Sequence, residues 1–401
     1  MTRPVLLMLL SRHPYAEKSG RGFMLRQRIE QAQRRFETRL VVVGHAAGDP
    51  SDGGLTFLPM ATPFGIAMNA ASAPDAPMQT WLFSAPGARA RVAEMAGDAA
   101  AIYVDMLRLA PLARDAPARV ARVIDYDDLL SERYRLAAGA DYDVMGFLAQ
   151  RMGLMRRVAR AFSKPLLRAE SVRCAKYERE MADVADLVVF TSPREADALG
   201  GDRVIAAPPM REPLGTTPPP GRRIIFLGNM RYAENVTMLR ELAEAVRALR
   251  AQSAWPADAV IEAVGDHNED LPARFDPQSF RFVGRIAELE ALAGAGVFLA
   301  PVTSGSGVKI KVLDGMALGC PVVATPKALE GLAARANRDL IIAPTPGAVL
   351  RAALALREMP QLKQMLAKRA RAYLERAHSS AIGDAFCEAI ETAIRRRQET
   401  L

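Results

Sequence analysis

Short runs of apolar, β-branched residues alternate with helix-like segments along most of this 401-residue chain. Runs of this kind are typical of buried strands in a parallel sheet, because both faces of such strands are covered by other elements. In the first half the pattern predicts strands at 5–10, 40–43, 101–104, 120–124 and 187–190, with helices at roughly 22–36, 86–97, 129–138 and 170–183. The alternation indicates an α/β domain with a parallel sheet covered on both sides, which is called doubly wound.

A proline-dense stretch interrupts this pattern, with six prolines between positions 207 and 222. Such a composition favours an extended, semi-rigid connection, so we predict a linker at 207–222. The alternation then resumes, with strands expected at 224–226, 260–264, 280–283, 297–299 and 321–323 and helices at 235–251, 286–293 and 309–318. We therefore predict two doubly wound, Rossmann-like domains, 1–206 and 223–378, and a C-terminal helix within 379–401 that could cross back to the N-terminal domain.

The net charge of +8 is concentrated in one segment. Residues 151–180 carry nine basic and three acidic side chains, which leaves the rest of the chain close to neutral. Because the segment offers neither a set of aromatic stacking residues nor a nucleic-acid-binding motif, we expect no nucleic-acid partner. Within 151–176, Met152, Met155, Phe162 and Leu166 fall near helical spacing between basic residues, which predicts contact with an anionic membrane surface; the alternative is a core-facing helix with a solvated basic face.

No apolar run approaches the roughly 20 residues that cross a bilayer. The run that follows Arg3 ends at Ser11, so it is shorter than the apolar region of a signal peptide, and we expect a cytoplasmic protein. The three cysteines, Cys174, Cys320 and Cys387, are widely separated in the sequence. This odd number and spacing predict buried thiols rather than disulfides or a cysteine-based zinc site.

A glycine-rich loop, Gly305-Ser306-Gly307, lies between an expected strand and a helix expected to begin at Lys309. Backbone N–H groups and the positive end of a helix favour an anion at such a turn. Lys309 and Lys311 follow directly in a chain that has only eight lysines. The loop thus predicts a diphosphate site; the alternative is a glycine turn followed by solvated lysines.

Three separated motifs resemble the donor half of the group 1 glycosyltransferases of GT-B fold, in their order and spacing. They lie at 225–235, 282–286 and 300–325, and the resemblance covers about 223–376. More weakly, the motifs at 11–15, 124–134 and 191–196 resemble sugar transferases of bacterial exopolysaccharide assembly. The resemblance implies two Rossmann-like domains facing a cleft, with the C-terminal helix packing across both.

The same resemblance implies roles for individual residues of the second domain. Lys309, Lys311 and Arg231 would stabilise the leaving diphosphate, Asp314 would accept from a ribose hydroxyl, and the base would rest near Arg285. Ser306 stands where the family commonly has a glutamate. The implied donor contacts are made by Gly228, Asn229, Gly284, Arg285, Gly305, Ser306, Gly307, Asp314 and Glu330. The alternatives are a surface ion pair for Arg231 and solvated carboxylates for Asp314 and Glu330.

Candidate residues of the first domain follow its expected strands. Gly20 and Gly22, flanked by Arg12 and Arg26, could approach a phosphate or the acceptor, or they could be turn glycines with surface arginines. Asp127, in the run Asp125-Tyr126-Asp127-Asp128, could be an acceptor-side catalytic carboxylate. A metal-binding DxD motif and helix capping by Asp128 are the alternatives, and we expect no bound metal because GT-B enzymes generally need none.

These features together predict a hexosyltransferase that takes a sugar from a nucleotide diphosphate sugar, its co-substrate, without a further cofactor. The resemblance implies retention of anomeric configuration and a saccharide acceptor, lipid-linked at the inner membrane face, in exopolysaccharide or cell-surface polysaccharide synthesis. A nucleotide-sugar epimerase and a non-catalytic nucleotide-sugar-binding protein are the alternatives. A dehydrogenase is disfavoured, because no GxGxxG sequence follows the first strand.

Overall fold

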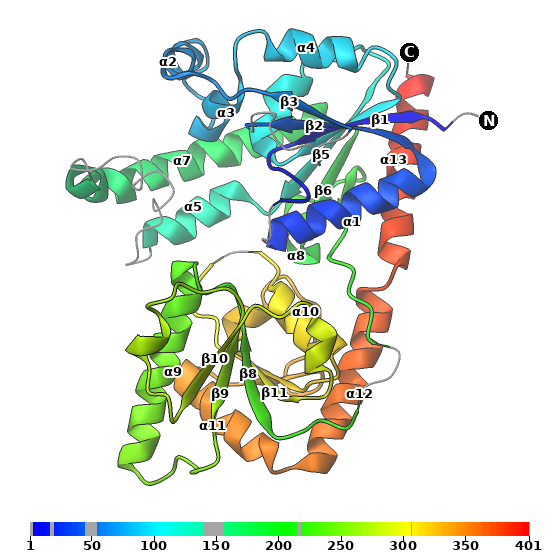
Figure 1. Ribbon diagram of the computed structural model, residues 1–401. Coiled ribbons are helices and arrows are strands. Elements are labelled where there is room, and N and C mark those ends of the chain that lie inside the picture. The colour runs from blue at the N-terminus through cyan, green and yellow to red at the C-terminus, as the bar shows by residue number, and fades with distance from the viewer. Residues whose placement is uncertain are drawn as a thin grey trace. The chain divides into compact units, whose positions relative to one another are not determined.

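The computed structural model describes residues 3–16, 20–44, 54–139, 156–214, 218–305 and 307–400, and it describes no side chains at 156–163. The chain divides into two compact units, Met1–Ala207 together with Gly383–Leu401, and Pro208–Ile382. Each unit contains one sheet whose strands are all parallel in the described residues (Figure 1). The predicted α/β class with two Rossmann-like sheets is confirmed.

The described residues of the first unit form a seven-stranded sheet in the order β3-β2-β1-β4-β5-β6-β7. Neighbouring strands pair in register, for example Leu6 with Ala101 and Val104 with Ile124. The strands are β1 (Val5–Leu10), β2 (Glu37–Val43), β3 (Leu55–Leu58), β4 (Ala101–Asp105), β5 (Ala121–Asp127), β6 (Leu187–Phe190) and β7 (Val204–Ala206).

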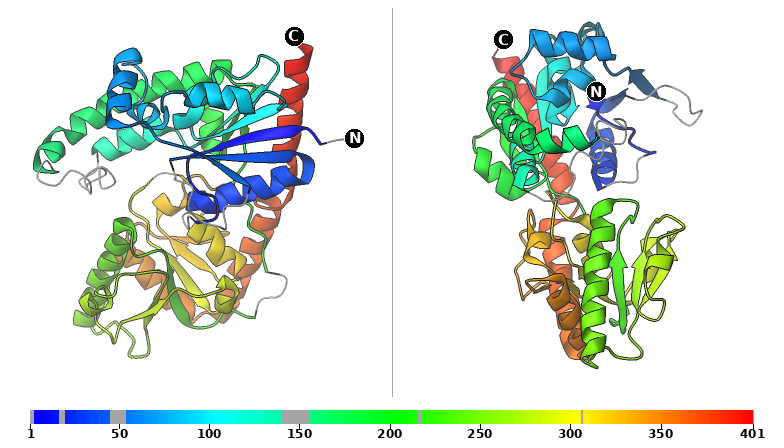
Figure 2. Two further views of the ribbon diagram at one scale, coloured as in Figure 1. Left: turned by 45° about the horizontal axis from the view of Figure 1, so that its top comes forward. Right: turned by 90° about the vertical axis from the view of Figure 1, so that its left-hand side faces the viewer.

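Helices cover both faces of this sheet (Figure 2). Successive strand residues point to opposite faces. Ile102 and Val104 therefore belong to a hydrophobic cluster on one face, while Tyr103 meets the ring of Phe386 edge-on at 6.1 Å on the other. The helices are α1 (Gly20–Arg35), α2 (Pro63–Ser72), α3 (Met78–Phe83), α4 (Ala88–Met95), the 3₁₀ helix η1 (Leu107–Ala113), α5 (Leu130–Gly139), α7 (Arg156–Val184), α8 (Pro193–Leu199) and α13 (Ala381–Glu399).

Helix α13 packs against α1 within the first unit. The guanidinium of Arg28 on α1 lies 4.7 Å from the centre of the Phe386 ring. A Cβ atom at Gly383 would lie only 2.4 Å from the side chain of Gln31, so the close approach of the two helices depends on a glycine at this position.

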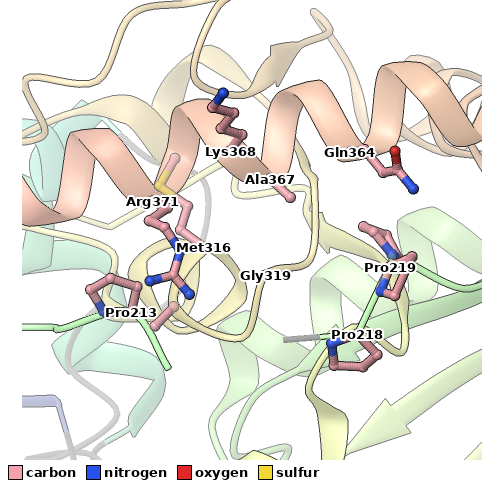
Figure 3. A pocket seen from close by; sticks show the side chains of 11 residues that line it. Pro213, Pro218, Pro219, Met316, Gly319, Gln364, Ala367, Lys368 and Arg371 are labelled. Atoms are coloured by element: carbon pink, nitrogen blue, oxygen red, sulfur yellow. The ribbon is translucent and has the colours of Figure 1, made fainter. Parts of the chain in front are cut away.

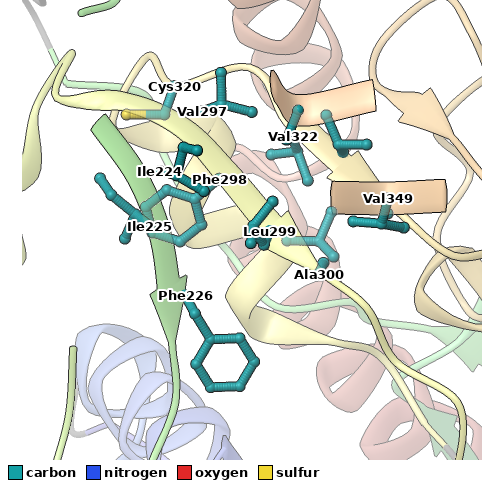
Figure 4. Packing of buried hydrophobic residues seen from close by; sticks show 14 of the residues in the cluster. Ile224, Ile225, Phe226, Val297, Phe298, Leu299, Ala300, Cys320, Val322 and Val349 are labelled. Atoms are coloured by element: carbon teal, nitrogen blue, oxygen red, sulfur yellow. The ribbon is translucent and has the colours of Figure 1, made fainter. Parts of the chain in front are cut away.

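The second unit contains a six-stranded sheet among its described residues, in the order β10-β9-β8-β11-β12-β13. Its buried strand residues, including Ile225, Phe298 and Leu299, form one continuous core with the covering helices (Figure 4). The strands are β8 (Arg223–Leu227), β9 (Ile261–Val264), β10 (Phe280–Gly284), β11 (Gly296–Ala300), β12 (Val322–Ala324) and β13 (Ile341–Ile342). The helices are α9 (Ala233–Ala251), α10 (Ile310–Ala317), α11 (Pro346–Arg357) and α12 (Pro360–Ala377), with 3₁₀ turns η3 (Pro272–Arg274), η4 (Leu289–Leu292) and η5 (Pro326–Leu329).

Two predicted helices differ from those observed. The helix expected at 286–293 is only the 3₁₀ turn η4, because Leu292 is the single buried residue of that segment and no apolar stripe holds a longer helix against the sheet. The helix expected at 170–183 is the C-terminal part of α7, which extends back to Arg156. The short strands β3, β7 and β13 were not predicted, because two to four residues show no usable periodicity.

Candidate functional site

The carboxyl ends of the second unit's strands place most of the predicted donor residues at one edge of the sheet. In the strand order, β9 lies on one side of β8 and β12 lies on the far side of β11, so the direction of winding reverses between β8 and β11. Ligands of open α/β sheets bind where this reversal occurs. The segments that leave β8 and β11 here are 228–232 and 301–309.

The turn after β8 is held by its own backbone and by one asparagine. The amide of Gly228 donates to the carbonyl of Val264 at 3.0 Å. The side chain of Asn235 donates to the carbonyl of Asn229 at 2.7 Å and leaves no room for a Cβ at Gly228, where its atoms would be 3.0 Å away. Gly228 and Asn229 therefore form a rigid turn at the switch point.

Two lysines follow the glycine loop after β11, and Lys311 reaches the asparagine that holds the turn after β8. Helix α10 begins at Ile310, so Lys309 lies just before it, and its Nζ donates to the carbonyl of Gly307 at 2.9 Å. Nζ of Lys311 donates to Oδ1 of Asn235 at 2.7 Å and lies 5.1 Å from the centre of the Phe226 ring. Burial, and secondarily the charge of Lys309, lowers the pKa of Lys311 to about 8.

Gly305 and Gly307 have φ values of 90° and 72°, in the left-handed region that favours glycine. They turn the chain between β11 and α10, which brings the first turn of α10 and the two lysines to the same edge as Gly228. Ser306 lies outside the described residues. The arrangement presents cations beside a helix N-terminus, which is chemistry suited to a diphosphate.

Asp314 on α10 is buried and is paired with Arg211. Nε of Arg211 donates to Oδ1 of Asp314 at 2.8 Å, and Nη2 donates to the same oxygen. Burial raises the pKa of Asp314, and Arg211 opposes that rise. Sequence reasoning missed Arg211 because it lies in the predicted linker; the one signal was a pair of charged residues, Arg211 and Glu212, between prolines at 209 and 213.

The side chains of the remaining predicted donor residues make their contacts with residues other than Lys309 and Lys311. Arg231 is exposed and forms an ion pair with Asp266 at 3.3 Å, the alternative that its sequence context left open. Gly284 has a φ of 76°, and the exposed Arg285 follows it. Glu330 pairs with Lys327 at 2.6 Å. The donor-binding roles of these residues stay predictions.

The first unit gathers charged residues at the corresponding edge of its own sheet. The winding reverses between β1 and β4, and Ser11, directly after β1, donates its amide and hydroxyl to Oδ2 of Asp105 at 2.9 and 2.6 Å. Arg21 on α1 donates to Oδ1 of Asp105 through Nε at 3.0 Å. Burial acts to raise the pKa of Asp105, but Arg21, Arg12 and the Ser11 hydrogen bonds hold it at about 2.

Asp127 stands at the end of β5 in an unusual backbone conformation. Its φ is 65°, and the ladder with β6 shifts register between Asp125 and Asp127, which is a bulge that re-aims the side chain. Asp127 accepts from Arg21 at 3.1 Å and from Thr191 at 2.9 Å, with Arg133 at 3.8 Å. These cations outweigh the effect of burial and lower the pKa of Asp127.

The predicted glycine loop of the first unit is part of a helix. Helix α1 begins at Gly20, so Gly20 and Gly22 lie in its first turn rather than before it. Nη1 of Arg26 donates to the carbonyl of Pro14 at 3.0 Å, and Nη2 of Arg12 reaches Sδ of Met106 at 3.9 Å. Sequence reasoning missed Arg21, Asp105, Arg133 and Thr191 at this edge.

Several other features of the described residues bear on the predicted chemistry. All three cysteines are buried and free, as predicted. No group of three or more His, Cys, Asp or Glu side chains is arranged to hold a metal ion in this part of the chain. Among the described helices, none combines the length and the apolar composition needed to cross a membrane.

A pocket of the second unit lies at the other end of α10 from the lysines (Figure 3). Met316, Ala317 and Gly319, at the C-terminal end of the helix, form one wall, and prolines of the 207–222 segment form another. Gln364, Lys368 and Arg371 of α12 complete it. No predicted site residue lines this pocket.

Comparison with known proteins agrees with this geometry. Residues 221–358 match the family model described as "Glycosyl transferases group 1". No curated protein sequence gives a significant match. Among solved structures, a sucrose-phosphate synthase from Thermosynechococcus elongatus is similar at 14% identity and a TM-score of 0.63, covering 98% of this chain and 100% of that one.

Two further structures are similar over nearly the whole chain. The Anabaena protein HepE, in complex with UDP and glucose, has 15% identity and a TM-score of 0.63, with 97% of this chain and 100% of that one covered. A UDP-forming α,α-trehalose-phosphate synthase from Burkholderia xenovorans has 12% identity and a TM-score of 0.58, with 98% and 99% covered. The chain therefore has the GT-B fold of these glycosyltransferases, and its second unit carries the group 1 family match.

Proposed function

We propose that the protein is a glycosyltransferase that transfers a sugar from a nucleotide diphosphate sugar to a saccharide acceptor. The observation that carries the proposal is the position of the two lysines at the switch point of the second sheet. Lys311 bonds to Asn235, the side chain that holds the turn at Asn229, and Lys309 donates to the glycine loop that follows β11. This edge matches the group 1 family model, and two of the similar structures are named for UDP as a ligand or product. UDP is therefore the first nucleotide to test.

The proposed chemistry follows from the charges at this edge. When the bond from the sugar to the diphosphate breaks, negative charge grows on the leaving group. Preplaced ammonium groups and helix N–H groups stabilise that charge more in the transition state than in the ground state. The sugar, with oxocarbenium character, then forms a bond to the acceptor hydroxyl oxygen, and the hydroxyl proton passes to the departing diphosphate. Asp314, held by Arg211, would accept from a ribose hydroxyl.

The further details of the proposal are a hexose as the transferred sugar, retention of anomeric configuration and no bound metal. Protein cations supply the positive charge that a metal supplies in other transferases. We also propose a lipid-linked acceptor in exopolysaccharide or other cell-surface polysaccharide synthesis, with peripheral contact to the inner membrane face through 151–176. Of that segment, 151–155 and the side chains at 156–163 lie outside the described residues.

Beyond 163, helix α7 directs Leu167 and Cys174 inward, while Lys164, Arg168 and Lys176 are exposed. This orientation supports a solvent-facing basic surface in the described part of the segment. Basic residues on such a surface contribute about 1 kcal/mol each when they lie near an anionic membrane.

A thermal-shift screen against UDP, GDP, ADP and dTDP sugars tests the donor. A ligand at 100 times its Kd adds about 2.7 kcal/mol to the free energy of unfolding, which raises Tm measurably. Reactions with and without added saccharides, followed by mass spectrometry and proton NMR, then separate three functions. A glycosylated acceptor in the mass spectrum indicates transfer, and an inverted stereocentre in the free sugar nucleotide, seen by NMR because epimers have equal mass, indicates epimerisation. Binding without either product indicates a non-catalytic protein. Absence of stabilisation by every sugar nucleotide would contradict the donor site.

A further inference from the structure

Arg108 is a cation of the first unit without a counter-ion in the described residues. It lies in η1, directly after β4, where Nη2 is 2.7 Å from Sδ of Met106 and the guanidinium carbon is 5.3 Å from the centre of the Phe83 ring. Its Nε is buried and has no hydrogen-bond partner among the described residues. A thioether and a ring face stabilise a guanidinium far less than a carboxylate or a phosphate does.

Two other arginines act on the charge of Arg108. Arg12 approaches the same sulfur of Met106 at 3.9 Å, and both Arg12 and Arg133 disfavour the charge on Arg108. Burial is the larger effect, and together they lower the pKa of Arg108 to about 10 although Asp105 opposes the shift. The segments that follow β1, β4 and β5 therefore bring Arg12, in the turn after β1, and Arg133, on α5, near Arg108 in η1.

The carboxylates at this edge are already engaged by other groups. Asp105 accepts from Arg21 and from Ser11. Asp128 accepts from Arg133 through Nε at 3.0 Å and through Nη2 at 2.6 Å. Neither acid is thus available as a dedicated partner for Arg108.

Two further observations mark the same place. Oε1 of Gln79 is a buried acceptor without a hydrogen-bond partner in the described chain. Nε2 of the same side chain donates to the hydroxyl of Tyr134. Tyr134 in turn interacts electrostatically with Arg108, which places Gln79 in the same neighbourhood. Met106 has a φ of 69°, a backbone conformation that residues other than glycine rarely adopt. An unsatisfied donor, an unsatisfied acceptor and local strain coincide beside the switch point of the first sheet.

We propose that Arg108, with Arg12 and Arg133, binds a phosphate or diphosphate group of the acceptor, and that Gln79 accepts a hydrogen bond from a hydroxyl of the same molecule. The proposal rests on the glycosyltransferase function proposed above and specifies its acceptor as an anionic sugar derivative. A phosphate oxygen would receive the N–H groups of Arg108 in the planar geometry that guanidinium favours, and would offset the repulsion among the three cations.

Calorimetric titration of the full chain with pyrophosphate tests the site. The titration uses the Lys309→Ala, Lys311→Ala double variant as the parent. These two changes remove the lysines of the candidate donor site, so that the remaining pyrophosphate binding is assigned to the first unit. Arg108→Gln in that background should weaken pyrophosphate binding about 10- to 100-fold, the scale of losing a charge-assisted hydrogen bond. Arg108→Lys keeps the charge but loses the planar guanidinium. Its pyrophosphate affinity should lie between that of the lysine double variant and that of Arg108→Gln.

Arg91→Gln is the matched control, since it removes one positive charge from an exposed arginine of the same unit that pairs with Glu94. It should bind pyrophosphate as the parent does. Thermal melts of each variant exclude unfolding, and Arg108→Lys keeps the test decisive if Arg108→Gln does not fold. Equal pyrophosphate affinity in the parent and in either folded Arg108 variant would overturn the proposal.

Two probes distinguish the sources of the anion. Preference for a soluble hexose phosphate over pyrophosphate would indicate a sugar phosphate acceptor, and preference for a short-chain prenyl diphosphate would indicate a lipid-linked one; each preference must be lost in Arg108→Gln. These binding results do not depend on donor turnover. An Arg108-dependent site in a protein that neither binds nor consumes sugar nucleotides would contradict the proposed function alone.

Discussion

The side-chain amine of Lys311 lies 2.7 Å from the amide oxygen of Asn235, and the amide nitrogen of the same asparagine donates to the carbonyl of Asn229. One side chain thus joins the cation that follows β11 to the turn that follows β8. Because β8 and β11 are the strands between which the winding reverses, this asparagine fixes the distance between the two halves of the candidate donor site.

Replacing either Lys309 or Lys311 by alanine should lower turnover about 100- to 1000-fold, the scale of losing one preorganised electrostatic contact. The fold should survive, because neither lysine belongs to the apolar core of the second unit. Lys368→Ala, on the exposed side of α12, is the matched control and should retain parental turnover. Parental turnover in both site variants would remove the leaving-group role.

Donor affinity should fall as the pH rises through about 8, because burial lowers the pKa of Lys311 to that value and the neutral amine no longer attracts a diphosphate. The experiment is a UDP titration between about pH 7.5 and 9.5, where the nucleotide phosphates are already ionised because their second pKa is about 6. Lys311→Arg should flatten the profile, since arginine stays protonated there. An unchanged decline in that variant would assign it to another group.

The same group makes a stability prediction with a defined sign. The pKa of Lys311 is lower in the folded protein than its ordinary value of 10.5, so the unfolded chain holds the proton more strongly between about 8 and 10.5. The contribution of Lys311 to the free energy of unfolding therefore increases, and the folded protein becomes more stable, as the pH rises through this window. Urea unfolding of the parent and of Lys311→Met should show the parent gaining relative stability from about pH 7.5 to 9.5; a constant difference would contradict the lowered pKa.

Arg211→Ala should destabilise the second unit, because it leaves the buried carboxylate of Asp314 without its cation. Arg211 keeps about a quarter of its side chain exposed, so we expect a loss of about 1–3 kcal/mol, below the cost for a fully buried pair. The Arg211→Ala, Asp314→Ala double variant should recover part of the lost stability, and the Asp314→Ala single variant completes the cycle. Urea unfolding of all four proteins gives the coupling energy, and strictly additive effects would show that the pair is not coupled.

Chelation by EDTA should leave transfer activity essentially unchanged, and Asp127→Asn should not produce a defect that added metal rescues. The physical reason is that Asp127 already faces Arg21 and Arg133, so a divalent ion would have to displace a guanidinium. Activity assays with Mg²⁺, Mn²⁺ and EDTA provide the measurement. Strict dependence on either ion would favour the alternative DxD interpretation of 125–127.

Replacing Arg156, Arg157 and Arg160 with glutamine should sharply reduce sedimentation of the protein with anionic vesicles. Added salt should reduce sedimentation of the parent protein in the same way, because the attraction decays within a Debye length, which is about 8 Å at physiological salt. Arg89, Arg91 and Arg119, exposed elsewhere on the first unit, provide a control triple glutamine variant with the same loss of charge. Equal pelleting of the 156–160 variant would make the segment a structural element only.

The sequence predicted those features that depend on local pattern. Strands 5–10 and 187–190 have the bounds expected from their apolar runs, and the glycines around position 306 correctly indicated a turn beside Lys309. Arg21 and Asp105 are 84 residues apart, and Arg211 and Asp314 are 103 apart. Such pairs follow from the order of the strands within a sheet, and no local spacing carries that order.

The first unit is assembled from two separate stretches of chain, Met1–Ala207 and Gly383–Leu401, whereas Pro208–Ile382 is continuous. During synthesis the second unit can therefore be complete before the helix that covers Tyr103 and Arg28 has left the ribosome. Domains emerging first usually fold first. Here the order of completion is reversed, because the first unit is complete only after Gly383–Leu401 has been translated, and until then the surface that α13 covers stays exposed.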